Sequence, residues 1–226
     1  MRLTFNIHSW GGWSPQYQQP VDWKYWYSLN PSIQEELHLA PKLTQVPSIQ
    51  RRRYSNLTKM QLEAAFQCDT PHPCRSIFAS RHGELHRTIG LLDNLIEQEP
   101  LSPTAFSQSV HNTASGIYSI LRKDQSPSTS IVAGEETLFQ ALIEAYAQLH
   151  EDPSPLLLVF GDEPVPEKYV QFTSEIELPI SMAFILTLAS DVNSGAKLTI
   201  NKSDTLTRYK NLKYGALLHG LANQQA

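Results

Sequence analysis

The sequence has little of several features that would identify a protein class at once. It contains two cysteines, Cys68 and Cys74, which flank His72 in "CDTPHPC" without the second ligand pair of a typical zinc site. Its 18 lysines and arginines stand against 22 aspartates and glutamates, a formal net charge of -4. The sequence therefore predicts no metal site in this segment and gives no reason to expect nucleic-acid binding.

Long apolar runs are also missing. The most apolar stretch, residues 177–190, is too short to span a bilayer and predicts a buried strand. The first residues, "MRLTFNIHSWGG", lack the apolar core and cleavage site of a signal peptide. We therefore expect a cytoplasmic protein with reduced thiols and no membrane span.

The chain does contain an alternation of strand-like and helix-like segments. Its 226 residues suit one α/β domain with a sizeable core, which we assign to 1–226, better than two very small domains. The alternation predicts a mixed sheet covered by helices. Strands are predicted at 2–10, 75–80, 128–133, 156–160, 182–190 and 196–202, and helices from Ser55, from Leu85, over 104–121, from Glu135 and over 211–222.

Two helical segments and one loop carry the clearest patterns. Ser55 is a good N-cap for a helix whose apolar residues share one face. The strongest helical signal places four apolar residues at i, i+4, i+7 and i+11, namely Leu85, Ile89, Leu92 and Ile96. The loop after the first strand is rich in rings that either cap a core, the reading we favour, or line an apolar cleft: Trp13, Trp23, Trp26 and Tyr27.

Three segments carry a resemblance to a known family. They read "RRRYSNLTKMQLEAA", "IFASRHGELHRTIGLLDNL" and "PLSPTAFSQSVHNTASGIYSI". This pattern resembles the N-terminal half of β-ketoacyl synthases, which have the thiolase fold. It is most similar to the short ketosynthase-like chain length factors of type II polyketide and aryl polyene clusters.

The resemblance implies that this sequence lacks the catalytic residues of active ketosynthases. Aligned on Pro127 and the following strand, Glu135 stands where active members carry the nucleophilic cysteine. A thiolate at a helix start attacks a thioester, whereas a carboxylate is a poor nucleophile toward it. The two histidines of full ketosynthases belong to a C-terminal half beyond the length of this sequence. We therefore expect no catalytic residue and no cofactor, and no condensation by this chain alone.

The resemblance also implies an interface. In the thiolase fold, the strand corresponding to 127–133 runs antiparallel to its counterpart in a second subunit. Residues near 102–118 would then line the end of the partner's acyl tunnel, although each of them also fits an ordinary helix core. The interface and tunnel candidates are Ala105, Phe106, Val110, Tyr118, Ser128, Ser130 and Val132.

Other candidate groups have simpler explanations. Glu135 and Glu136 fit helix stabilisation better than an acid/base pair, because adjacent helical residues point about 100° apart. His82 and His86 lack the glutamate of an HExxH motif. Ser115 has no G-x-S-x-G context and lies within a predicted helix.

A basic cluster is the last candidate. Arg51, Arg52 and Arg53, with Lys59 and Arg81, either steer an acidic acyl carrier protein or form a solvated surface.

The preferred hypothesis is a silent chain length factor that pairs with a cysteine-bearing β-ketoacyl synthase and meets an acyl carrier protein. Two alternatives stay open at this point. One is a malonyl-thioester decarboxylase-like relative that uses Glu135. The other is a homodimeric scaffold that docks carrier proteins.

Overall fold

The computed structural model describes residues 2–26, 40–173, 179–189, 196–201 and 210–224. Within them the strands are β1 (Arg2–Trp13), β2 (Arg75–Ala79), β3 (Ser128–Ile131), β4 (Leu156–Asp162), β5 (Ile180–Leu188) and β6 (Ala196–Asn201). The α-helices are α1 (Ser48–Arg51), α2 (Asn56–Phe66), α3 (Leu85–Ile96), α4 (Pro103–Ser107), α5 (Thr113–Arg122), α6 (Thr137–Glu151) and α7 (Lys210–Gln224). Short 3₁₀ helices are η1 (Pro20–Tyr25), η2 (Gly134–Glu136) and η3 (Glu167–Phe172).

The strands form one mixed sheet in the order β3-β2-β4-β5-β1-β6. Strand β2 runs parallel to β3 and β4, whereas β5 is antiparallel to both β4 and β1, and β6 is antiparallel to β1. Strands β4 and β5 are buried on both faces, which explains their nearly continuous apolar sequences. The predicted mixed sheet covered by helices is confirmed.

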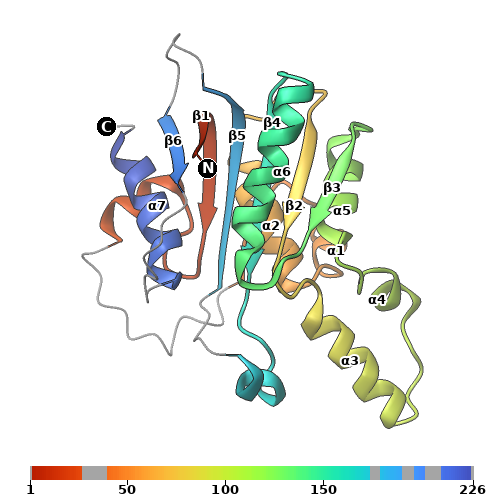
Figure 1. Ribbon diagram of the computed structural model, residues 1–226. Coiled ribbons are helices and arrows are strands. Elements are labelled where there is room, and N and C mark those ends of the chain that lie inside the picture. Colours follow the sequence, from red (N-terminus) through yellow and green to blue (C-terminus); the bar gives the residue numbers. More distant parts are fainter. Residues whose placement is uncertain (1, 27–39, 174–178, 190–195, 202–209, 225–226) are drawn as a thin grey trace.

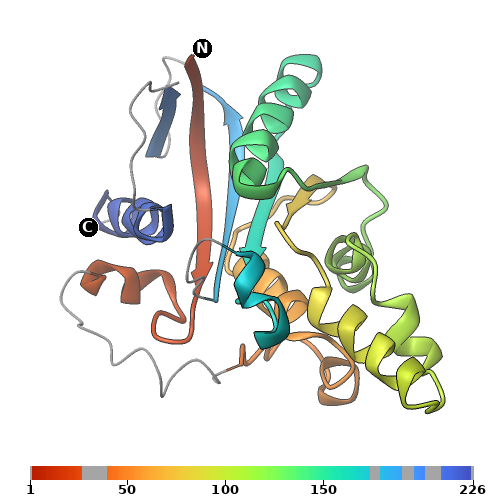
Figure 2. The same cartoon turned by 60° about the horizontal axis from the view of Figure 1, so that its bottom comes forward.

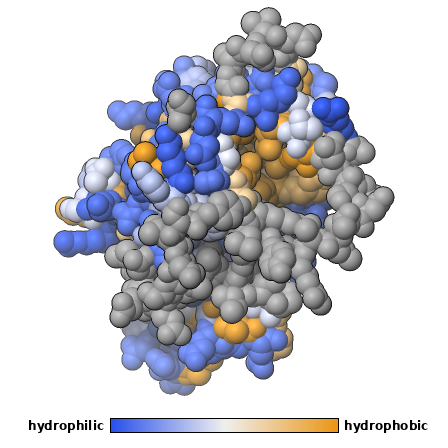
Figure 3. All heavy atoms as spheres, turned by 90° about the vertical axis from the view of Figure 1, so that its left-hand side faces the viewer, coloured by the Kyte–Doolittle hydropathy of each residue, from blue (hydrophilic) through white to orange (hydrophobic). Residues whose placement is uncertain are grey.

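Helices cover both faces of the sheet (Figures 1 and 2). The core under α6 and α7 contains Leu156 and Leu158 of β4, and the core under α2 and α5 contains Leu157 and Val159. Alternation along β4 therefore supplies both cores, because successive strand residues point to opposite faces. Seen from the side of β6 and α7, apolar side chains gather in one hollowed area of the surface (Figure 3).

The helix beginning after Ser55 is confirmed, with the Ser55 side chain accepting a hydrogen bond from the Thr58 N–H. The favoured reading of the aromatic loop also holds: Trp13 and Trp23 are fully buried and Trp26 stacks on Trp23. Tyr27 lies outside the described residues. In the described part of the chain, no helix is long and apolar enough to cross a bilayer.

The prediction of one helix over 104–121 is wrong. Helix α4 ends at Ser107, and α5 begins only at Thr113. Hydroxyl groups between them bond to the carbonyl three residues earlier, Ser109 to Phe106 and Thr113 to Val110. Such local bonds compete with the helical pattern and interrupt it.

Candidate functional site

Because β2, β3 and β4 are parallel, their carboxyl ends meet at one edge of the sheet. The segments that follow them, 80–84 after β2 and 132–136 after β3, lie there beside Asp162 at the end of β4. In α/β folds this edge is the usual place for ligand sites, because the loops after the strands converge on it.

The entry into α6 is shaped by Gly134 and Thr137. Gly134 has a φ of +55°, a left-handed conformation that glycine adopts without strain. The Thr137 hydroxyl donates to the Gly134 carbonyl at 2.6 Å and accepts from the Ala133 N–H at 3.0 Å. The turn therefore directs the side chain of the next residue, Glu135, outward, where it is 42% exposed.

A charged network surrounds Glu135. The Arg81 guanidinium lies 3.9 Å from the Glu135 carboxylate. The backbone N–H of Arg81 donates to Asp162 Oδ1 at 2.7 Å, and the Ser80 hydroxyl donates to the same oxygen at 3.0 Å. The three strand ends are thus joined by acidic and basic groups.

Both thiols lie away from this edge. Cys74 directly precedes β2, at the amino end of the parallel strands, and Cys68 lies just after α2. Both are buried and free. Burial raises the pKa of each thiol, so neither is poised as a thiolate.

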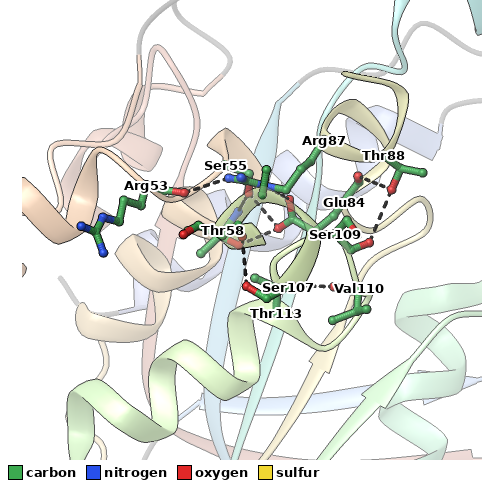
Figure 4. Close-up of polar contacts among 12 residues, drawn as sticks. Arg53, Ser55, Thr58, Glu84, Arg87, Thr88, Ser107, Ser109, Val110 and Thr113 are labelled. Carbon is green, nitrogen blue, oxygen red and sulfur yellow. Dashed lines mark hydrogen bonds and ion pairs between the residues drawn. The ribbon is translucent and has the colours of Figure 1, made fainter. Parts of the chain in front are cut away.

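A buried carboxylate lies at the start of α3 (Figure 4). Glu84 Oε1 accepts from the Ser55 hydroxyl at 2.7 Å and the Thr58 hydroxyl at 2.6 Å. Its other oxygen lies 3.7 Å from Arg87 Nε. Burial raises the pKa of Glu84, and the hydroxyl groups of Thr58 and Ser55 and the charge of Arg87 reduce that rise.

The first turn of α3 is tied to three further segments. Arg87 donates to the Arg53 carbonyl at 2.9 Å, and the Thr88 hydroxyl donates to the Glu84 carbonyl at 3.0 Å and lies 3.4 Å from the Ser109 carbonyl (Figure 4). His86 Nε2 lies 2.6 Å from the Pro164 carbonyl. The base of α3 is therefore held mainly by polar contacts.

The histidines and Ser115 have structural positions. Gly83, with a φ of +57°, separates His82 from α3 and leaves no room for a Cβ beside the His111 ring. Ser115 is buried inside α5 and donates to the Asn112 carbonyl. No group of three or more histidine, cysteine or acidic side chains in the described residues could hold a metal ion.

The residues of the basic cluster have different roles. Arg51 donates through Nη1 to the carbonyls of Lys42 and Leu43, so it fixes the preceding loop. Arg52 and Arg53 are exposed. Burial lowers the pKa of Lys59, and the positive charges of Arg51 and Arg87 lower it further. Positive charge is therefore concentrated around this turn.

The candidate tunnel residues do not share one environment. Phe106 and Val110 are exposed and Ala105 is half-buried, all three on α4 or just after it. Tyr118 is buried against Phe66 and Phe78 in the core under α2 and α5, as an ordinary core residue would be.

Strand β3 is an edge strand of the described sheet. The carbonyls of Pro127 and Ile131 accept from β2 and from Ser80, so these alternate residues face β2. The backbone groups of Ser128, Ser130 and Val132 consequently point away from the sheet, since N–H and C=O of one strand residue lie on the same side. These three residues offer a pairing edge.

The sequence did not single out Ser80 or Asp162, it raised Glu84 only together with His82 and His86 as a metal candidate, and it assigned Arg81 only to the basic cluster. One available signal was position, because polar residues directly after buried parallel strands often line a site. The ion pair of Arg81 with Glu135 joins residues 54 positions apart, and predicting it requires knowledge of which strands are neighbours in the sheet.

Residues 23–225 match the family described as "Beta-ketoacyl synthase, N-terminal domain". The chain belongs to this family. The resemblance drawn from the sequence is thereby confirmed, and the sheet and its helices have the thiolase-like ketosynthase fold. No curated protein matches the sequence.

Solved structures agree with this assignment. The chain is similar to one in the complex of the ketosynthase ApeO with its chain length factor ApeC from Xenorhabdus doucetiae, at 26% identity and a TM-score of 0.81. The match covers 97% of this chain and 92% of that one. The fold also resembles the ishigamide ketosynthase/chain length factor, at 13% identity and a TM-score of 0.67, over 85% of this chain and 64% of that one.

The fold is likewise shared with a chain of the AntDE:AntF complex of a type II polyketide synthase, at 11% identity and a TM-score of 0.59. There the match covers 83% of this chain and 64% of the other. This ketosynthase-like chain thus spans less than two thirds of these two chains, but nearly the whole of the chain in the ApeO and ApeC complex.

Proposed function

We propose that this protein is a non-catalytic chain length factor that pairs with a cysteine-bearing β-ketoacyl synthase in the cytoplasm. The observation that carries the proposal is Glu135 at the entry to α6, paired with Arg81 where the family's nucleophile would stand. A carboxylate held by a guanidinium is a weak nucleophile toward a thioester. The likeness to the ketosynthase and chain length factor complex supports the pairing.

The edge strand β3 is the pairing element in this proposal. Its outward N–H and C=O groups at Ser128, Ser130 and Val132 would meet the equivalent strand of the ketosynthase in antiparallel register. Such pairing satisfies backbone groups on both chains and extends the sheet from one subunit into the other.

The product-length role belongs to the segment around α4. Phe106 and Val110, both exposed, and Ala105 would close the far end of the partner's acyl tunnel. A packed wall limits chain growth because one more two-carbon unit would need space the wall does not give. The small side chain of Ala105 leaves room for an extended product, such as an aryl polyene.

Carrier-protein docking belongs to the turn after α1. Arg52 and Arg53 are exposed there, whereas Arg51 is held by the carbonyls of Lys42 and Leu43. Acyl carrier proteins are acidic, so positive charge at this turn would speed their encounter with the complex.

The test is co-expression with each cysteine-bearing ketosynthase of the source genome, followed by purification and native mass spectrometry. We expect a one-to-one complex. In that complex Phe106→Ala should lengthen the products. Failure of every such ketosynthase to bind at micromolar concentration contradicts the proposal.

A second candidate is a malonyl-thioester decarboxylase. It is favoured by the partial exposure of the Glu135 carboxylate, which leaves that group accessible. The isolated protein and its Glu135→Ala variant are incubated with malonyl-carrier protein, and carbon dioxide is measured. Carbon dioxide release by the wild-type protein that is lost in Glu135→Ala would favour a decarboxylase over a chain length factor. Carrier binding by a homodimer, lost on charge reversal of Arg52 and Arg53 with product lengths unchanged, would favour a scaffold instead.

A further inference from the structure

Helices α3 and α4 form an arm, residues 85–107, that projects from the body of the molecule (Figure 1). The apolar face predicted for α3 is present, but the body covers only its first half. Ile89 is buried, whereas Leu92 is 47% and Ile96 is 79% exposed. Leu95, at 55%, lies on the same exposed side, since residues three and four apart are neighbours on a helix.

Two more exposed apolar side chains lie on the rest of the arm. Helices α3 and α4 contact each other, and Leu101 and Phe106 are exposed on the connection and on α4. An amphipathic helix normally buries its apolar face, and clustered exposed apolar side chains on a single chain mark an interaction site.

The arm is fixed at its base, so its exposure is built into the fold. Glu84 is bound by Ser55 and Thr58 and faces Arg87, and Lys168 of η3 contacts Asp93 of α3 at 2.8 Å. These polar contacts hold α3 at its first turn and near its middle. They leave Leu92, Leu95 and Ile96 exposed.

The charges around the arm restrict the partner. Glu97 and Glu99 follow the exposed residues, Asp93 is paired with Lys168 of η3, and no lysine or arginine lies in the sequence between Thr88 and Arg122. The acidic residues of the arm would repel an acidic carrier protein or an anionic membrane surface. The basic turn at Arg52 and Arg53 would attract both. The arm and the basic turn therefore suit different partners.

We propose that the α3–α4 arm grips the ketosynthase subunit through Leu92, Leu95 and Ile96, a contact additional to the pairing at β3. This inference rests on the proposed pairing. Its occupant is the ketosynthase because the same arm carries Phe106, an exposed residue of the segment proposed to close that subunit's tunnel. The contact would fix the angle at which the tunnel end meets its wall.

The test compares the ketosynthase affinity of the full chain with that of the double variant Leu95→Gln/Ile96→Gln. Glutamine keeps helix propensity and alters only side chains already exposed in the free chain, so far-UV circular dichroism and thermal unfolding should not change. Val21→Gln is the matched control, because Val21 is 58% exposed on η1, across the molecule from the arm. We expect the double variant to weaken binding at least tenfold and the control less than twofold.

Several outcomes would overturn the inference. If the double variant binds the ketosynthase as tightly as the wild type, the arm does not contact it, although the proposed function stands. If the variant loses only self-association in sedimentation, or only carrier-protein binding, the occupant is a second copy or the carrier. If the wild-type chain binds no ketosynthase, the proposed function fails first and the inference fails with it.

Discussion

Glu84 and Asp124 are buried carboxylates that hold loops together, and their pKa values shift in opposite directions. Burial would raise the pKa of Asp124, but hydrogen bonds from Ser126, from the Cys74 N–H and from His72 outweigh it, so the pKa lies well below its usual range. For Glu84 burial prevails, because its donors are two hydroxyl groups and the Arg87 charge.

Asp124→Asn should lower the free energy of unfolding at pH 7 by about 1–3 kcal/mol, because one charged acceptor of several bonds is lost. A depressed folded-state pKa contributes stability above the unfolded value of about 4 and loses it as pH falls through the folded value. Urea unfolding at pH 7 and pH 3 should therefore show a smaller difference between wild type and variant at pH 3. An equal difference at both pH values would refute this account.

Glu84→Ala should cost about 2–4 kcal/mol, since Ser55, Thr58 and Arg87 lose a shared buried partner. Glu84→Gln, which keeps an acceptor for the hydroxyl groups, should cost less.

The pH dependence of the Glu84 variants has a defined sign. The raised pKa means that ionisation opposes folding, so the wild type loses stability as pH rises above about 4, whereas the glutamine variant does not. The stability of Glu84→Gln relative to wild type should therefore increase from pH 4 to pH 7 in urea titrations. A constant or decreasing difference would contradict the assignment.

Among the elements, α7 shows how a single close approach fixes a helix. Gly215 lies against the Trp26 ring, and a Cβ there would overlap the ring atoms. Gly220, on the same helix, has no atom within 4 Å of such a Cβ. Only the first glycine is therefore required by packing.

We expect Gly215→Ala to destabilise the protein by about 1–3 kcal/mol through overpacking. Gly220→Ala should stabilise it by up to about 1 kcal/mol, because alanine has the higher helix propensity. Thermal unfolding monitored by circular dichroism compares the two. Similar melting temperatures for both variants would show that α7 does not pack on Trp26 as described.

The elements also show which sequence signals were sufficient. Ser55 as a cap and the apolar runs of β4 and β5 predicted their elements correctly, since these signals are local. The break between α4 and α5 was missed because periodicity continues across it. The hydroxyl groups of Ser109 and Thr113 donate hydrogen bonds to nearby backbone carbonyls instead, and the spacing of apolar residues does not reveal these bonds.

At the scale of the whole molecule, β3 is the proposed pairing edge between two subunits. Ser130→Pro should abolish ketosynthase pairing, because it removes an N–H that points away from β2. It should leave the fold intact, since that N–H has no role in the ladder with β2. Ser130→Ala, which keeps the N–H, is the control. Size-exclusion chromatography of the co-expressed pair measures both, and a normal complex with Ser130→Pro would exclude β3 as the pairing edge.

The sequence by itself determined the family and the mixed sheet, because these follow from local apolar patterns and from segments whose residue types recur together. It also predicted a helix from Glu135, whereas Glu135 lies in the short turn η2 and α6 begins at Thr137. Only the tertiary structure decided that Arg81 meets that carboxylate, that Glu84 is buried beside Arg87, and that half of the α3 apolar face is uncovered. These contacts join distant parts of the chain, and their energies depend on burial, which strand order and helix placement set.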